Sequence, residues 1–296
     1  MNCEKAKEFI LGNARPFELS LYRYFFEGGT KEDVIAQLQA FQNPDGGFGH
    51  GLEADNWNPN SNPIATNDAI ITLFRIDALD ADNEMVRSIL RYLESHDAFD
   101  EEKRRWLFAI ETNRDYPHGF WWEKTDDGIH GFNPTVSLAT VCACFGDNSG
   151  YYEEIVREAF SYLTETEDVS GDALKCFLLS YELLRSQGKT DVVDLEQARR
   201  VISERLETAI CKDTRLYGVE YVPVPSDFFA GKYNEFITDE IRNLIHAEKA
   251  VLGKLQAPDG GFDISWAWGT DYAEFSQARA WWRPRITIDK LLFWEN

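Results

Sequence analysis

The stretch LQAFQNPDGGFG, residues Leu38–Gly49, decides the expected fold, because the chain repeats it as KLQAPDGGFD, residues Lys254–Asp263. Both copies follow an amphipathic helical pattern and read Gln-x-x-x-Gly-x-Phe. A phrase that recurs in this form indicates a structural repeat, in which each copy joins the same two kinds of element. The sequence therefore predicts a repeat architecture before it predicts any chemistry.

Most residues of the repeated phrase are expected to be structural. The aspartate before each Gly-Gly pair, Asp45 or Asp259, is typical of a turn. The glutamine that opens each copy, Gln42 or Gln256, is expected to hydrogen-bond a helix end, and the phenylalanine is expected to wedge neighbouring helices together. His50 and two carboxylates follow the first copy, but its turn does not need them.

A third, degenerate copy is predicted in DYPHGFWW, where Asp115, Gly119 and Trp121 take the three positions. A proline follows each copy at the point where the next helix is expected to begin, because proline suits the first helical turn. These prolines are Pro63, Pro134 and Pro284, and Asn62 and Asn133 precede two of them as predicted N-caps.

Helical periodicity dominates the chain and predicts an all-α fold. Some helices are apolar on one side only, as in Lys31–Gln42, and others are apolar most of the way round, as in Ile64–Phe74. We therefore expect two concentric rings, with the second kind inside. Outer helices are predicted near 4–13, 31–42, 83–96, 151–164, 194–211 and 237–256, inner ones near 16–27, 64–77, 134–145, 172–187 and 285–294, and an extra helix near 103–113. The outer helix 194–211 has no predicted inner partner, because YVPVPSDFFAG does not have a helical pattern.

The Gln-x-x-x-Gly-x-aromatic phrase between an outer and an inner helix resembles the repeat motif of terpenoid cyclases and protein prenyltransferase subunits. The two clear copies and the two-ring pattern extend this resemblance over nearly the whole chain. It implies a single α/α-toroid domain over residues 1–296, built from five or six helical hairpins. It implies no particular activity, because toroids support many unrelated functions.

The catalytic motifs of these families do not match the chain. The string DADN, Asp80–Asn83, is similar to the protonating Asp-x-Asp-Asp motif of squalene-type cyclases but lacks its last aspartate, and we expect it to cap a helix. Prenyltransferases hold zinc with Asp, Cys and His, but Asp172, Cys176 and His246 lack the surrounding motif. The zinc motifs of lanthipeptide cyclases, another toroid group, are absent too. We therefore expect no bound metal and no cofactor.

The composition restricts the possible partners. The 30 basic and 51 acidic residues leave a formal net charge of −21, which repels phosphate backbones and disfavours nucleic-acid binding. No apolar stretch approaches the roughly 20 residues of a membrane span, and the first residues lack the apolar core of a signal peptide. The five cysteines include no C-x-x-C pair, which fits free thiols in the reducing cytoplasm, where we expect this protein to work.

Seven of the nine tryptophans lie in the three outer-to-inner loops, together with His50, His118 and His130. All such loops of a toroid emerge on one face, so we expect these groups to surround one opening, the usual setting of a ligand site. A histidine and two carboxylates within six residues favour acid–base chemistry, and we name His50, Glu53 and Asp55 as candidate catalytic residues. The candidate ligand-binding residues are Trp57, His118, Trp121, Trp122, Glu123, Asp271, Trp281, Trp282 and Arg283.

The arginines beside the last tryptophans, Arg279, Arg283 and Arg285, fit either an anion clamp or plain salt bridges to this acidic chain. The leading interpretation is a protein that binds a small ligand in its loop-lined opening, with a carbohydrate-like substrate if it is an enzyme. The first alternative is an isoprenoid-handling protein, and the second is a non-catalytic scaffold for a protein or peptide. An open polar and aromatic cleft favours sugars, a deep dry cavity favours isoprenoids, and an exposed apolar patch favours the scaffold.

Overall fold

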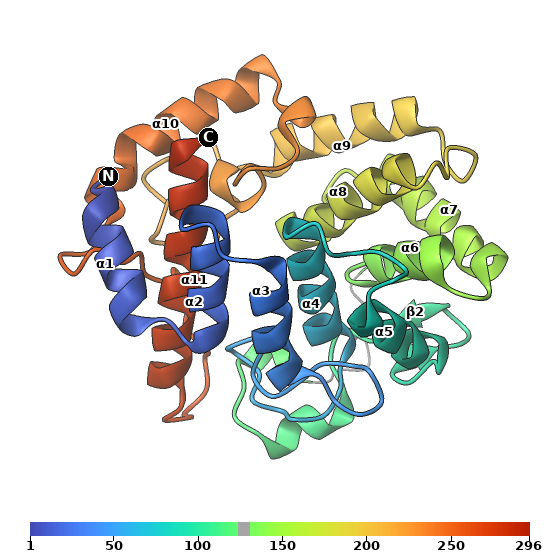
Figure 1. Cartoon of the computed structure of the whole chain (residues 1–296). Coiled ribbons are helices and arrows are strands. Elements are labelled where there is room, and N and C mark those ends of the chain that lie inside the picture. The colour runs from blue at the N-terminus through green and yellow to red at the C-terminus, as the bar shows by residue number, and fades with distance from the viewer. Residues whose placement is uncertain (124–130) are drawn as a thin grey trace. The chain divides into compact units, whose positions relative to one another are not determined.

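A computed structural model describes residues 1–123 and 131–296 of the chain. These residues contain eleven α-helices, five short 3-10 helices and one two-stranded sheet, which confirms the predicted predominance of helix (Figure 1). They form two compact units. Unit 1 combines Met1–Leu38 with Glu207–Asn296, and unit 2 spans Gln39–Leu206. No helix within the described residues is long and apolar enough to cross a membrane.

Unit 1 contains both ends of the chain. The last helix, α11, packs against α1 and α2, so it lies beside the first two helices (Figure 1). Between α9 and α10 the described chain forms only the short 3-10 helices η4 and η5, so no α-helix follows the predicted outer helix 194–211 directly. The elements of unit 1 are α1 (Cys3–Asn13), α2 (Pro16–Phe26), α3 (Lys31–Leu38), η4 (Pro225–Asp227), η5 (Asn234–Phe236), α10 (Asp239–Leu255) and α11 (Phe275–Glu295).

Unit 2 shows the two predicted kinds of helix. Helices α4, α6 and α8 are buried along most of their length, whereas α5 and α7 bury one side, and α6 packs against α5, α7 and α8. The elements are η1 (Gln39–Phe41), α4 (Pro63–Arg75), α5 (Glu84–Glu94), β1 (Phe99–Asp100), β2 (Arg105–Trp106), η2 (Glu111–Asp115), η3 (Phe120–Trp122), α6 (Thr135–Phe145), α7 (Ser149–Glu165), α8 (Gly171–Ser186) and α9 (Leu195–Ala209), which ends in unit 1.

The two clear copies of the repeated phrase form the same turn, one in each unit. In both copies the glutamine amide donates to the carbonyl of the first glycine, at 3.0 Å for Gln42 and 2.8 Å for Gln256. The aspartate carboxylate accepts the N–H of the second glycine, at 2.9 Å for Asp45 and 3.0 Å for Asp259. The predicted role of the aspartates as turn formers is confirmed, and both glutamine amides hydrogen-bond within the turn that follows their helix.

The phenylalanine of each copy is tied to the next helix. The N–H of Phe48 donates to Thr66 Oγ1 over 3.1 Å, and the N–H of Phe262 donates to Thr287 Oγ1 over 3.0 Å. Both phenyl rings are buried. The turn therefore fixes the next helix by a hydrogen bond as well as by apolar packing.

The predicted third copy of the phrase is wrong. Gly119 has a φ of −70°, whereas Gly46 has +100°, and a Cβ on Gly119 would meet the Trp121 ring. The aromatic-to-threonine link occurs instead at Trp106, whose N–H donates to Thr135 Oγ1 over 3.1 Å. The helix predicted at 103–113 is also wrong, because Trp106 pairs with Phe99 in the β1–β2 hairpin.

The helix starts agree only in part with the prolines. Pro63 opens α4 and the Asn62 side chain caps it, as predicted, but the N-cap of α6 is Pro134 rather than Asn133. Pro284 lies inside α11, which begins at Phe275. An interior proline costs about 3 kcal/mol, and contacts of the preceding turns, including the Arg279–Asp263 ion pair and the packing of Phe275 on Trp268, oppose that cost.

The DADN string caps a helix, as predicted. Asn83 is the N-cap of α5, and its side chain accepts the N–H of Met85 over 3.0 Å. The Asp80 carboxylate accepts the N–H groups of Asp82 and Asn83, both at 3.0 Å. The first carboxylate of the string is therefore part of a turn.

Replacing Gln256 with alanine is expected to lower the free energy of unfolding by about 1–2 kcal/mol. The Gln256 side chain joins the end of α10 to the start of α1, because it accepts the Asn2 N–H over 2.7 Å and donates to the Asn2 carbonyl over 2.9 Å. Urea denaturation measures the change. Gln277→Ala, at an exposed position of α11, is the control, and an equal change in both variants would contradict the assigned role.

Candidate functional site

Two loops of unit 2 pair through their backbones. The Trp57 N–H donates to the Pro117 carbonyl over 3.0 Å, and the Gly119 N–H donates to the Asp55 carbonyl over 3.0 Å. Residues 56 and 118 pair between these two bonds. We call residues 49–62 and 116–123 the paired loops. They bring together the candidates His50, Glu53, Asp55, Trp57, His118, Trp121, Trp122 and Glu123.

Asparagine side chains hold the paired loops in place. The Asn58 amide donates to Thr112 Oγ1 over 2.8 Å and to Asn113 Oδ1 over 2.9 Å. The Asn113 amide in turn donates to the Trp122 carbonyl over 3.0 Å. Asn58 and Asn113 are both buried, so these amides provide hydrogen-bond partners where water is excluded. The loop geometry is therefore fixed by polar contacts inside the protein.

The three candidate catalytic residues occupy different environments. His50 is exposed, has a φ of 56°, and places its Nε2 2.8 Å from Asn43 Oδ1. Glu53 is half-buried, and Asp55 is only 3% exposed. Asp55 is the least accessible of the three to solvent, and residues 116–123 pair with its backbone through the Gly119 N–H.

His118 lies in the second of the paired loops, residues 116–123. It is buried as deeply as Asp55, with 3% of its surface exposed. Its Nδ1 lies 2.6 Å from the Tyr116 carbonyl oxygen. A carbonyl oxygen can only accept, so Nδ1 carries the hydrogen, and the neutral ring presents Nε2 as its acceptor. This tautomer is the one that a general base needs at Nε2.

The aromatic candidates of the paired loops divide into two kinds. Trp122 is buried and stacks on Phe108, with ring centroids 5.0 Å apart and planes 14° apart, so it is part of the local core. Trp57 and Trp121 are half-buried, which leaves part of each ring at the surface, and Glu123 is exposed. His130, which the sequence places near the same loops, lies outside the described residues.

The remaining candidates, Asp271, Trp281, Trp282 and Arg283, belong to unit 1. Arg283 forms an ion pair with Asp259 at 2.8 Å, which confirms salt bridging for this arginine. Trp282 packs edge-to-face against Trp266 at 5.6 Å, and the Arg15 guanidinium lies 4.9 Å from the Trp281 ring centroid. Asp271 is exposed. The common opening for these residues and the paired loops stays a prediction.

The sequence interpretation missed the asparagines of the paired loops and the buried aspartate of α4, Asp68. A signal for the asparagines was present in NWNPNSN, residues Asn56–Asn62, where a polar amide occupies every second position. Asp68 follows two other buried polar residues, Thr66 and Asn67, in a mostly apolar helix, and no local spacing marks it as different.

The described residues contain no group of three or more His, Cys, Asp or Glu side chains that could hold a metal ion. Asp172 pairs with Lys175 at 3.0 Å, and the Cys176 thiol donates to Asn133 Oδ1 over 3.5 Å. Burial raises the pKa of Cys176 to about 11 and that of Cys144 to about 12. Both thiols therefore stay protonated at neutral pH and are poor nucleophiles.

Comparisons with known proteins give no match to any family model, curated protein or solved structure. No relative therefore suggests an activity. The chemistry of the paired loops is the remaining basis for a function.

Proposed function

We propose that this protein binds a carbohydrate-like ligand at the paired loops, where acid–base chemistry is available to act on it. The observation that carries the proposal is the burial of Asp55 and His118 in the same pair of loops. Burying ionisable groups opposes folding, and a loop that only connects two helices does not need them. Binding and catalytic sites retain such groups because the chemistry requires them there.

The side chains of the paired loops suggest the ligand class. Glu53 and Asp55 supply two carboxylates, which accept hydrogen bonds from hydroxyl groups and are also the residue type that hydrolyses glycosides. Trp57 and Trp121, both half-buried, offer aromatic surface beside them. Aromatic side chains beside a small number of polar groups are typical of small-molecule sites. An isoprenoid favours a dry aromatic cavity, and the buried amides and carboxylate make these loops polar.

We propose further that the helices complete an α/α toroid and that the protein works in the cytoplasm. The three aromatic-to-threonine links support the toroid. Each joins the segment that follows a predicted outer helix, α3, α5 or α10, to the predicted inner helix that comes next, α4, α6 or α11. In unit 1, the turn that follows α10 also rests on α1. The five free cysteines fit a reducing compartment. Small-angle X-ray scattering tests the toroid. A toroid is expected to give the scattering profile of one compact particle, and the profile of two separated bodies would exclude it.

Asp55→Asn is expected to weaken ligand binding at least about tenfold, because a charge-assisted hydrogen bond is lost while the shape is kept. The experiment first screens mono- and oligosaccharides against prenyl diphosphates by the shift in melting temperature of the wild-type protein. The best sugar is then titrated calorimetrically into wild type, Asp55→Asn and Glu53→Gln. Asp191→Asn makes the same chemical change at an exposed turn and serves as the control. Stabilisation by prenyl diphosphates alone, or full affinity of Asp55→Asn, would overturn the proposal.

A further inference from the structure

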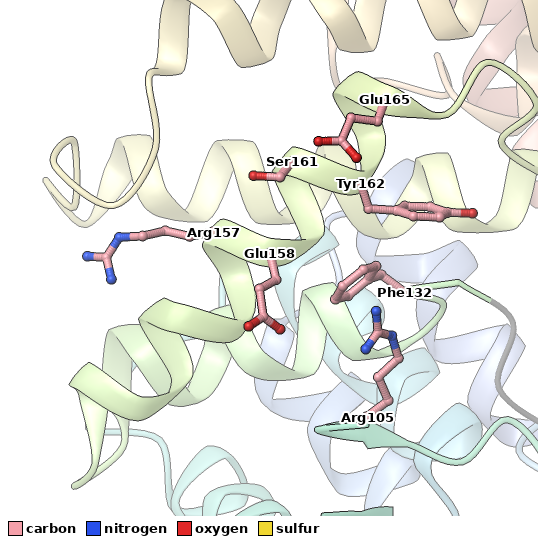
Figure 2. Close-up of a pocket in the computed structure, with 7 residues that line it drawn as sticks. All are labelled: Arg105, Phe132, Arg157, Glu158, Ser161, Tyr162 and Glu165. Atoms are coloured by element: carbon pink, nitrogen blue, oxygen red, sulfur yellow. The ribbon is translucent and has the colours of Figure 1, made fainter. Parts of the chain in front are cut away.

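A shallow depression of about 400 Å³ opens beside α7 in unit 2 (Figure 2). Five of its lining residues come from successive turns of α7, one comes from β2, and one precedes α6. None belongs to the paired loops, so the depression is a separate site. The lining residues are Arg105, Phe132, Arg157, Glu158, Ser161, Tyr162 and Glu165.

Arg105 is the central cation of this depression. Its guanidinium lies over the Phe132 ring, 3.7 Å from the centroid (Figure 2). Its Nε donates to the Gly131 carbonyl over 3.0 Å, and its Nη1 donates to the Lys103 carbonyl over 2.6 Å. Burial lowers the pKa of Arg105, but a guanidinium stays charged at neutral pH.

Arg105 has no ion-pair partner in the part of the chain that the structure describes. Its neighbour Arg104 takes the nearby carboxylates, because it pairs with Glu154 and Glu158. The chain has 51 acidic residues against 30 basic ones, so a half-buried arginine without a carboxylate is unusual here. The two carbonyls use two of the five guanidinium N–H groups, which leaves three donors of a charged group for another acceptor.

The hairpin that carries Arg105 has a strained backbone. His96, Ala98 and Arg104 all have φ values between 53° and 57°, a left-handed region that is strained for a residue other than glycine. The hairpin is nevertheless fastened to α7, because His96 Nε2 lies 3.0 Å from the Tyr152 hydroxyl. Such a support holds Arg105 in one place before a ligand arrives, which favours binding.

We propose that the depression binds a small molecule through a singly charged carboxylate group, whose oxygens accept from the Arg105 guanidinium. The hydroxyls of Ser161 and Tyr162 line the same depression and supply further donors. Glu158 repels an anion only weakly, because Arg104 neutralises its charge. Glu165 is exposed and disfavours ligands of higher negative charge, so a monoanion fits better than a phosphate dianion.

The experiment titrates wild-type protein with benzoate at constant ionic strength and follows backbone amide shifts by NMR, with benzyl alcohol as the neutral analogue and inorganic phosphate as the dianion. Saturable shifts at residues 105, 132, 161 and 162 are expected for benzoate only. Arg105→Gln is expected to weaken benzoate at least about tenfold. Arg114→Gln removes the same charge from an exposed side chain outside the depression and is expected to leave the affinity unchanged.

Absence of saturable shifts in the wild type, equal affinity for benzyl alcohol, or unchanged affinity of Arg105→Gln would overturn the inference. Arg105→Lys keeps the charge but loses the planar fork, and it is expected to bind more weakly than wild type. If Arg105→Gln does not fold, the benzoate affinity of Arg105→Lys and the residues that shift in the wild-type protein still test whether benzoate binds at Arg105. Shifts confined to the paired loops would overturn this site while leaving the carbohydrate proposal intact.

Discussion

Alanine at Gly46 or Gly260 is expected to lower the free energy of unfolding by about 3 kcal/mol or more, measured by urea denaturation. Both glycines have left-handed backbones, with φ of 100° and 98°, which cost another residue roughly 1–2 kcal/mol. An added Cβ would also lie 2.5 Å from the carbonyl carbon of Ser88 or Lys5 and closer still to its oxygen. Such overpacking costs about 1–3 kcal/mol more, because helix backbone has to move.

Two other glycines provide the matched control. Gly12 in α1 and Gly150 in α7 have no atom within 4 Å of an added Cβ, and neither has a positive φ. Alanine at these helical sites is expected to leave stability unchanged or to raise it by about 0.5–1 kcal/mol. Equal effects at all four glycines would show that the repeated turn does not depend on the close approach of its glycine to a helix.

Removing the Glu248 carboxylate by alanine is expected to cost about 3–5 kcal/mol of folding free energy, the range for breaking a buried ion pair. Glu248 is fully buried and accepts from Lys290 Nζ at 2.7 Å, from the Ser226 hydroxyl at 2.6 Å and from the Ser226 N–H at 2.9 Å. These bonds join α10, α11 and the irregular segment around η4. The Lys290 side chain is only 14% exposed. Without Glu248, the Lys290 ammonium would therefore lose its ion-pair partner, and water could solvate it only in part.

The double variant Glu248→Leu with Lys290→Met distinguishes the cost of an unpaired buried charge from the cost of lost side-chain packing. Because it leaves no unpaired charge, it is expected to recover most of the stability that Glu248→Ala loses. Glu240→Ala breaks an exposed ion pair with Lys212, with side chains 46% and 61% exposed, and is expected to change stability by less than about 1 kcal/mol. Chemical denaturation of the three variants checks these values, and a small loss in Glu248→Ala would contradict a buried ionic junction.

The helices were predictable because their information is local. The 3.6-residue spacing of apolar side chains placed α1, α4, α7 and α10 to within a few residues, and the repeated phrase identified a turn whose hydrogen bonds recur in both units. The β1–β2 hairpin was not predictable in the same way. Ala98 and Arg104 have positive φ without being glycine, and the pairing of Phe99 with Trp106 replaces the helix that the apolar run after Arg105 indicates.

The candidate site was predicted in its residue types but not in its arrangement. His50, Glu53, Asp55 and His118 were identified as candidates by their residue types. The burial of Asp55 was not predictable, because it depends on backbone pairing with a segment about sixty residues further along the chain, and such pairing leaves no local pattern. Arg105 was missed altogether. Arg105 has no carboxylate partner among the described residues. The sequence cannot show this, because ion pairs depend on which side chains the fold brings together.

Carbohydrate binding at the paired loops is tested by hydrogen–deuterium exchange with and without the best-binding sugar. The sugar is expected to slow exchange mainly in residues 49–62 and 116–123, including the Trp57 and Gly119 amides that join the two loops. This protection is expected to disappear in Asp55→Asn at the same sugar concentration. Protection elsewhere in the chain with unchanged exchange in both loops would contradict the claim.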